Sequence, residues 1–92
     1  MGDPVEVVVG QRLRRRRRLL GMTQQELGAA CGVSFQQVQK YECASSRMSV
    51  AMLWKVACAL GVDVGYFFSG APRALDVRPA QPAPQARRVD AA

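Results

Sequence analysis

The chain has 92 residues, 13 of them Lys or Arg and seven Asp or Glu, and it contains no histidine, so its formal net charge is +6. This length fits one small domain with a tail and argues against a separate enzyme cleft. The missing histidine excludes the common nucleophile–base pairs and two-histidine metal motifs. We therefore expect a protein that is not an enzyme and uses no metal or cofactor, and its charge favours a polyanionic partner.

Cysteine usage and the N-terminal residues predict a reducing compartment. The three cysteines are odd in number and lack the CxxC spacing of a zinc ribbon or a redox motif. The first ten residues carry two acids and a proline instead of a basic start. No stretch approaches the ~18 apolar residues of a membrane span. We expect a cytoplasmic protein with no membrane partner.

The composition changes at Gly70. Four of the five prolines lie in residues 71–92, among Ala, Gln and Arg, with few larger aliphatic residues. A segment of this composition does not bury enough apolar surface to fold. We therefore predict a domain at residues 1–70 and a disordered tail at residues 71–92.

Capping and turn residues divide the domain into five short helical segments, and no strand-like alternation persists. Thr23 with Glu26 and Ser34 with Gln37 have the spacing of capping boxes, which open helices. Glycines follow three of the segments and are typical helix ends. We expect helices at about residues 4–20, 24–31, 35–43 and 50–60, and a last short turn between Asp63 and Ser69.

The second and third helices are joined by Gly32 and Val33, which predicts the abrupt turn of a helix-turn-helix. Gly28 falls where the two helices must approach closely, and Gly32 where the turn needs a left-handed backbone. Apolar side chains occupy the inward positions, namely Leu27, Cys31, Val33, Val38 and Tyr41.

The stretch MTQQELGAACGVSFQQVQKYE, followed by LWKVACALGV and DVGYFF, resembles the phage-repressor and Cro-like, xenobiotic-response-element-type helix-turn-helix family. The resemblance covers Val9 to Phe68, about two thirds of the chain. It implies an all-α, lambda-repressor-like fold, which we expect as a compact five-helix bundle. It also implies sequence-specific binding of double-stranded DNA.

A helical projection of the third helix separates two faces. Val38 and Tyr41 point inward, whereas Gln36, Lys40 and Cys43 lie opposite, flanked by Gln37 and Gln39. Glutamine can pair with adenine N6 and N7, lysine can reach guanine O6 and N7, and a helix fits the major groove. We interpret this face as a base-reading surface; the alternative is an ordinary solvated face.

The resemblance also assigns DNA contacts at the helix starts and in the following loop. It implies a phosphate contact at Gln24 and base contacts at Phe35, Gln36 and Gln37. Phe35 departs from the commoner glutamine, and its ring either packs on a thymine methyl group or turns back over the second helix. In the loop, Ala44 is expected to resist a positive φ and reshape the turn. Ser45, Ser46 and Arg47 remain able to hold phosphate.

The run Arg14 to Arg18 lies on the first helix, whose inward stripe includes Leu13. Arg17 falls inside this stripe and therefore needs a partner, and Glu42 on the third helix is the obvious one. The resemblance implies the same structural ion pair. Arg16 and Arg18 either contact phosphate or belong to a solvated face.

A domain this small buries a thin core, and one reading helix covers few base pairs. We therefore expect a homodimer that reads a pseudo-palindromic operator, with half-sites ~34 Å apart. The aromatic-rich segment is the predicted two-fold contact, through Val62, Tyr66, Phe67 and Phe68. The alternative is that two of the rings close the monomer core.

Cysteine roles also follow from these positions. Cys31 and Cys58 are expected to be small apolar core fillers. Cys43 is expected on the DNA side, where oxidation of an exposed thiol would block binding.

The sequence thus predicts a DNA-binding transcriptional regulator, most simply a repressor, with no small-molecule ligand apparent. The alternative is a protein-interaction module on the same fold, such as an antitoxin or antiactivator. Only the proline-rich tail supports that alternative.

Overall fold

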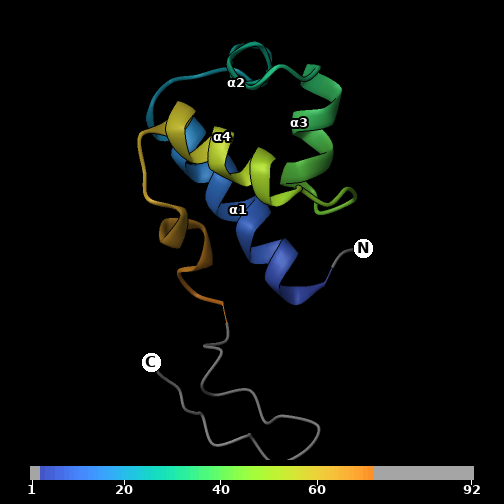
Figure 1. Ribbon diagram of the computed structural model, residues 1–92, viewed down its shortest axis with the longest axis vertical. Helices are drawn as coiled ribbons and strands as arrows, with labels where there is room; N and C mark the ends of the chain where they lie inside the picture. The colour runs from blue at the N-terminus through green and yellow to red at the C-terminus, as the bar shows by residue number, and fades with distance from the viewer. Residues whose placement is uncertain (1–2, 72–92) are drawn as a thin grey trace, which may run out of the picture.

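The computed structural model describes residues 3–71, so the predicted tail lies outside the described residues except for Ala71. The described part is all-helical and contains no strand. Figure 1 shows its elements in chain order, which are α1 (Pro4–Leu19), α2 (Gln24–Cys31), α3 (Phe35–Glu42), α4 (Val50–Leu60) and η1 (Val64–Phe68). None of these helices is long and apolar enough to cross a membrane.

The expected five-helix bundle needs one correction. Four α-helices form, but the fifth segment is a 3-10 helix of five residues. Its hydrogen bonds have 3-10 spacing, with the Tyr66 amide donating to the Asp63 carbonyl over 2.9 Å. So short a segment cannot recover the entropy of α-helix nucleation, and the Asp63 side chain does not cap it.

Local caps explain why the α-helices begin where the sequence predicts. Asp3, Thr23, Ser34 and Ser49 each accept a hydrogen bond from a backbone amide in the first turn that follows. The Thr23 and Glu26 capping box is complete. The expected Ser34 and Gln37 box is only half formed: the Gln37 backbone amide donates to Ser34 Oγ, whereas the Gln37 side chain bonds elsewhere, with its Nε2 donating to Ser46 Oγ over 2.9 Å.

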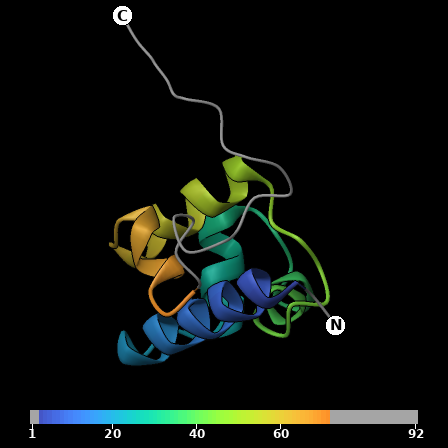
Figure 2. The same ribbon diagram turned by 90° about the horizontal axis from the view of Figure 1, so that it is seen from below.

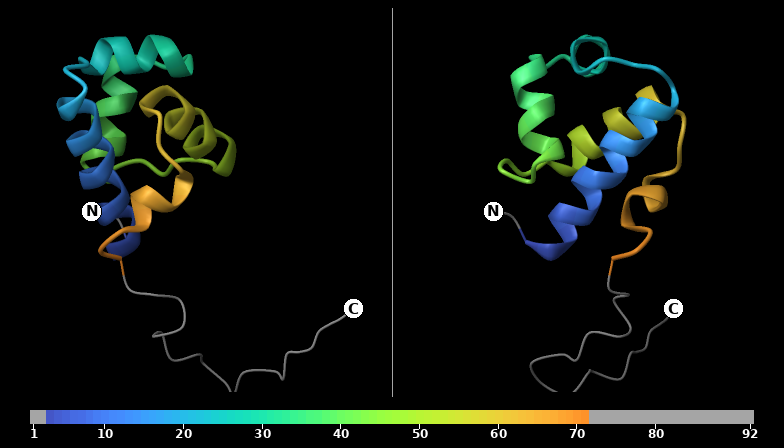
Figure 3. Two further views of the ribbon diagram at one scale, coloured as in Figure 1. Left: turned by 90° about the vertical axis from the view of Figure 1, so that its left-hand side faces the viewer. Right: turned by 180° about the vertical axis from the view of Figure 1, so that it is seen from behind.

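The helices pack around one core to which all five elements contribute. Figure 1 shows α3 at one end of the body, and Figure 2 shows α1 and α4 at opposite edges. In Figure 3, α2 lies across the top and η1 lies alongside α1, as their contacts require. The largest fully buried side chains are Leu13, Leu27, Val38, Val56, Leu60 and Phe67.

Two glycines allow helices to approach as closely as backbone atoms permit. A Cβ at Gly28 would lie 2.5 Å from the Val33 carbonyl oxygen, which explains the predicted need for glycine in the helix-turn-helix. A Cβ at Gly10 would lie 2.5 Å from the Tyr41 carbonyl oxygen and 2.8 Å from that of Glu42. Gly10 was not singled out from the sequence, yet it sets how closely α1 packs on the end of α3.

The end of α3 differs from expectation at Ala44. This residue adopts a φ of 60°, so it does not avoid the left-handed region. The Ala44 amide donates to the Tyr41 carbonyl and the Ser45 amide to the Lys40 carbonyl, which together form a Schellman motif. Ala44 is 5% exposed, so its methyl group is buried. The two hydrogen bonds and this burial offset a conformational cost of roughly 1–2 kcal/mol.

Replacing Gly10 by alanine tests the close packing of α1 on α3. We expect Gly10→Ala to lower the free energy of unfolding by about 2 kcal/mol, because the contact with two carbonyl oxygens outweighs the gain in helix propensity. Urea denaturation followed by circular dichroism measures this change. Gly65→Ala is the matched control, since a Cβ there meets no atom within 4 Å. Equal midpoints for the two variants would contradict the packing argument.

Candidate nucleic-acid interface

The outward face of α3 is polar, exposed and largely uncharged. Gln36, Gln39, Lys40 and Cys43 are exposed, whereas Val38 and Tyr41 are buried on the opposite side. The hydrophobic periodicity of this helix therefore orients four polar or thiol side chains away from the core.

The two ends of α3 carry further predicted site residues. Phe35, in the first turn, is 45% exposed. Gln37 is half-buried, and its amide is held by Ser46. Ser45 is exposed and its hydroxyl lies 3.4 Å from the Lys40 carbonyl oxygen, to which it donates. The α3 face and the loop after it are thus joined through the Gln37 and Ser46 side chains.

A buried ion pair between α1 and α3 holds this face in place. Arg17 Nε lies 2.6 Å from Glu42 Oε2, and the two side chains are only 10% and 4% exposed. Arg17 Nη2 also donates to Glu42 Oε1 over 3.1 Å, and Nη1 donates to the Met22 carbonyl over 2.8 Å. Such a bidentate arrangement fixes direction as well as distance.

Gln24, at the start of α2, belongs to the same network. Its amide Nε2 donates to Glu42 Oε1 over 3.0 Å, and the side chain is partly buried. One carboxylate therefore joins α1, α2 and α3. Because a primary amide has two N–H donors, this bond leaves Gln24 one further donor.

The arginines of α1 point in three directions, and one of them has a partner that the sequence did not indicate. Arg16 Nε donates to the Leu60 carbonyl at the end of α4 over 2.9 Å, so this side chain is directed toward α4. Arg12 similarly donates to the Ser69 carbonyl over 2.9 Å and lies over the Tyr66 ring. Arg16 is therefore removed from the candidate interface.

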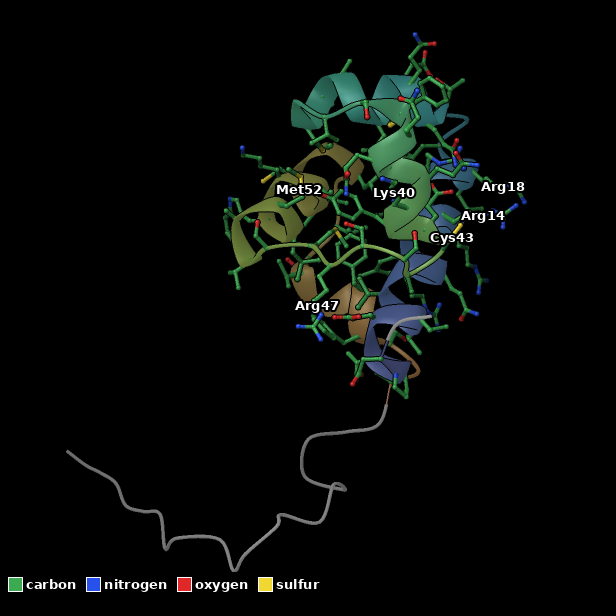
Figure 4. The ribbon with its side chains drawn as sticks, turned by 90° about the vertical axis from the view of Figure 1, so that its right-hand side faces the viewer. Arg14, Arg18, Lys40, Cys43, Arg47 and Met52 are labelled. Carbon is green, nitrogen blue, oxygen red and sulfur yellow. The ribbon has the colours of Figure 1, made fainter. Side chains whose placement is uncertain are left out.

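Arg14, rather than Arg16, belongs to the candidate interface. Figure 4 shows Lys40 at the centre of the α3 face, Arg14 and Arg18 to one side, and Arg47 below on the other. Arg14 and Arg18 are exposed and form no ion pair within the described residues. Arg47 pairs with Glu6 at 3.0 Å, but its side chain is 85% exposed. A helical wheel could have found Arg14 if Gly10 had been recognised as the contact with α3, because residue 14 lies only ~40° from residue 10.

Residues 13–67 match the family model HTH_3, described as helix-turn-helix. The chain belongs to the HTH_3 helix-turn-helix family. An HTH-type transcriptional regulator of Sinorhizobium medicae is 43% identical over 70 residues, which are 76% of this chain and 50% of that protein. A transcriptional regulator in the ATPase CF(0) region of Rhodospirillum rubrum is 48% identical, over 75% of this chain and 64% of that protein. The chain thus spans about half the length of the Sinorhizobium relative.

Solved structures of this HTH_3 fold agree with the arrangement. The restriction-modification controller protein C.AhdI from Aeromonas hydrophila is 30% identical with a TM-score of 0.66, over 68% of this chain and 96% of that one. The P22 c2 repressor, solved in complex with a synthetic operator, is 29% identical with a TM-score of 0.63, over 67% and 94% of the two chains.

Most side chains of the predicted dimer contact pack against the core of the domain instead. Phe67 is fully buried, so it is not available to a partner. Val62 and Tyr66 are half-buried and pack against the core, and only Phe68 is exposed, at 41%. The alternative expectation, that two rings close the monomer core, describes this segment.

The cysteines also divide differently from expectation. Cys31 is a buried core residue, and burial raises the pKa of its thiol. Cys58 is exposed, so it is not the core filler that the sequence suggested. Cys43 is exposed on the α3 face, in Figure 4 near Arg14.

Removing one partner of the buried ion pair tests its structural role. We expect Arg17→Ala to lower the free energy of unfolding by about 3–5 kcal/mol, since Glu42 is left buried without a cation. Arg47→Ala removes the other ion pair of the described residues, which is solvent-exposed, and we expect a loss below about 1 kcal/mol. Thermal unfolding of both variants makes the comparison. Similar losses for the two would show that Arg17 has no special structural role.

Proposed function

We propose that this domain is a sequence-specific regulator of transcription that binds double-stranded DNA with α3 in the major groove. The observation that carries the proposal is the exposed amide and ammonium face of α3, formed by Gln36, Gln39 and Lys40 and flanked by arginines on both sides. These side-chain types match the donor and acceptor pattern of base edges in the major groove. The buried Arg17 and Glu42 pair supports the same proposal, because it holds the reading helix in one orientation.

Phosphate contacts follow from the cations that flank α3. A helix of about 10–12 Å diameter fills a groove ~12 Å wide, so side chains on either side of it meet the two backbones. We assign Arg14, Arg18 and the free donor of Gln24 to one backbone, and Ser45, Ser46 and Arg47 to the other. Such contacts position the protein without reading sequence.

The relatives and neighbours support this function by likeness. The matched relatives are named as transcriptional regulators, and the P22 c2 structure contains a synthetic operator. We propose that this chain acts in the same way, most simply as a repressor that occludes a promoter. We further propose that it binds a pseudo-palindromic operator as a homodimer, because one α3 reads only a few base pairs.

Gln36 is the central test of base reading. A pool of random duplexes, selected at two salt concentrations, first identifies the bound sequence. We expect Gln36→Ala to lose about 1–3 kcal/mol of discrimination between this sequence and a scrambled one, while its binding to scrambled DNA is unchanged. Fluorescence anisotropy at fixed salt measures both affinities.

The control is Gln11→Ala, because Gln11 is also exposed but lies on α1. We expect it to retain wild-type discrimination. Recovery of random sequences by the wild-type protein would overturn the proposed function, and equal losses for the two variants would overturn the role of Gln36.

Phe35 supplies a different kind of contact. Its ring is 45% exposed in the first turn of α3, next to the exposed Gln36. An aromatic ring cannot bond to base edges as glutamine does, but it can pack against the C5-methyl group of thymine. We propose that Phe35 contacts such a methyl group in the operator.

Thymine-to-uracil replacement tests this contact atom by atom, because it removes only the methyl group. We expect one position in each half-site where uracil weakens wild-type binding about 4-fold, as the loss of one buried methyl group predicts. Phe35→Ala should bind the thymine and uracil sites equally. A uracil effect that persists in Phe35→Ala would assign the methyl contact to another residue.

A further inference from the structure

One face of α4 is apolar and exposed to solvent. Val50 and Trp54 are 87% and 64% exposed, and Ala51 and Cys58 are exposed beside them. Val50, Trp54 and Cys58 follow one another at intervals of four residues, so they form a continuous stripe along the helix. We call Val50, Ala51, Trp54 and Cys58 the α4 stripe. The core-facing side of α4 is separately occupied by buried residues.

We propose that the α4 stripe is the two-fold contact of the homodimer, packed against the same stripe of a second copy of this chain. The proposal rests on the proposed function, since it locates the contact that joins two reading helices. It also replaces the contact predicted for Val62 and the aromatic residues of η1, because Phe67 is fully buried.

Charge favours a second copy at this face over the exposed side of α1. A two-fold contact places each residue near its own counterpart, so the surface must be compatible with itself. The exposed side of α1 carries Arg14, Arg15 and Arg18, which would repel their copies. The α4 stripe has one cation at its edge, Lys55, and an apolar centre.

The position of α4 also leaves the α3 face and the α1 arginines free. Figure 2 shows α1 and α4 at opposite edges of the body. In Figure 4, Met52 of α4 lies to one side of Lys40, and Arg14 and Arg18 lie to the other. Joining two copies through α4 therefore leaves both α3 faces and both sets of α1 arginines uncovered.

The size of the stripe sets the expected strength of the dimer. Eight residue steps along α4 span only ~12 Å, so the contact is smaller than the ~800 Å² per partner of a standard interface. Tryptophan is among the residues that contribute most to such contacts. We expect a dissociation constant of about 1–100 µM for the free protein, and cooperative binding of two copies on an operator with two half-sites.

Sedimentation velocity of the full chain measures self-association directly, without DNA. We expect monomer and dimer to exchange with concentration in the wild type. Trp54→Glu should weaken association at least about 30-fold, because it places a charge at the centre of the contact. Leu19→Glu is the matched control, since Leu19 is 68% exposed on α1, and it should associate like the wild type.

The single tryptophan gives a second readout. Its emission should move to shorter wavelength as the wild-type protein is concentrated, because Trp54 leaves water in the dimer. Val50→Glu keeps the tryptophan and should abolish this shift. Circular dichroism confirms that each variant is folded, and all three substituted residues, Leu19, Val50 and Trp54, are exposed enough for the fold to tolerate a carboxylate.

DNA titrations separate this proposal from the proposed function. Trp54→Glu should bind a single half-site like the wild type but lose cooperativity on the two-half-site operator. A wild type that stays monomeric at about 100 µM and binds the operator without cooperativity would overturn the α4 contact while leaving DNA binding intact. Equal weakening by Leu19→Glu and Trp54→Glu would also overturn it. Self-association without any sequence-specific DNA binding would instead refute the proposed function.

Discussion

The buried pair of Arg17 and Glu42 is the interaction on which the orientation of α3 depends. An isolated helix of eight residues is unstable in water, so α3 owes its position to packing against its neighbours. Burying two charges is costly, and here four hydrogen bonds offset that cost, because Met22 and Gln24 add to the two direct bonds between Arg17 and Glu42. Four parts of the chain converge on one guanidinium and one carboxylate, which fixes the direction of the reading face.

The same contact fixes the rotation of α1 and thereby separates its run of five arginines. Gly10 and Arg17 both face α3, the first through close backbone approach and the second through its ion pair. With ~100° between successive residues, Arg14 and Arg18 then emerge beside α3, whereas Arg16 turns toward α4. The single basic run of the sequence thus has three roles in the structure. Arg17 forms a buried ion pair, Arg16 bonds to α4, and Arg14 and Arg18 are exposed beside α3.

The sequence predicted the features that depend on neighbouring residues and missed those that depend on distant ones. Helix bounds agree to within about one residue because caps are local hydrogen bonds. Arg17 needed a partner because of its place in an apolar stripe. Arg16 was misplaced because its acceptor, the Leu60 carbonyl, lies 44 residues away. Phe67 was misjudged because its burial depends on how η1 packs against α1, which no periodicity in a five-residue segment reveals.

The cations that have no partner within the domain separate attraction to DNA from the reading of its bases. Arg12 and Arg16 bind backbone carbonyls, and Arg17 and Arg47 have carboxylate partners. Within residues 3–71, the cations with neither an ion pair nor a hydrogen bond to a backbone carbonyl are Arg14, Arg15, Arg18, Lys40 and Lys55. Lys40 is the one cation on the α3 face itself. Electrostatic attraction to DNA therefore comes mainly from the arginines of α1 beside this face, and it acts on DNA of any base sequence. Discrimination must then come from uncharged side chains, the glutamines and Phe35, whose contacts depend on which bases lie beneath them.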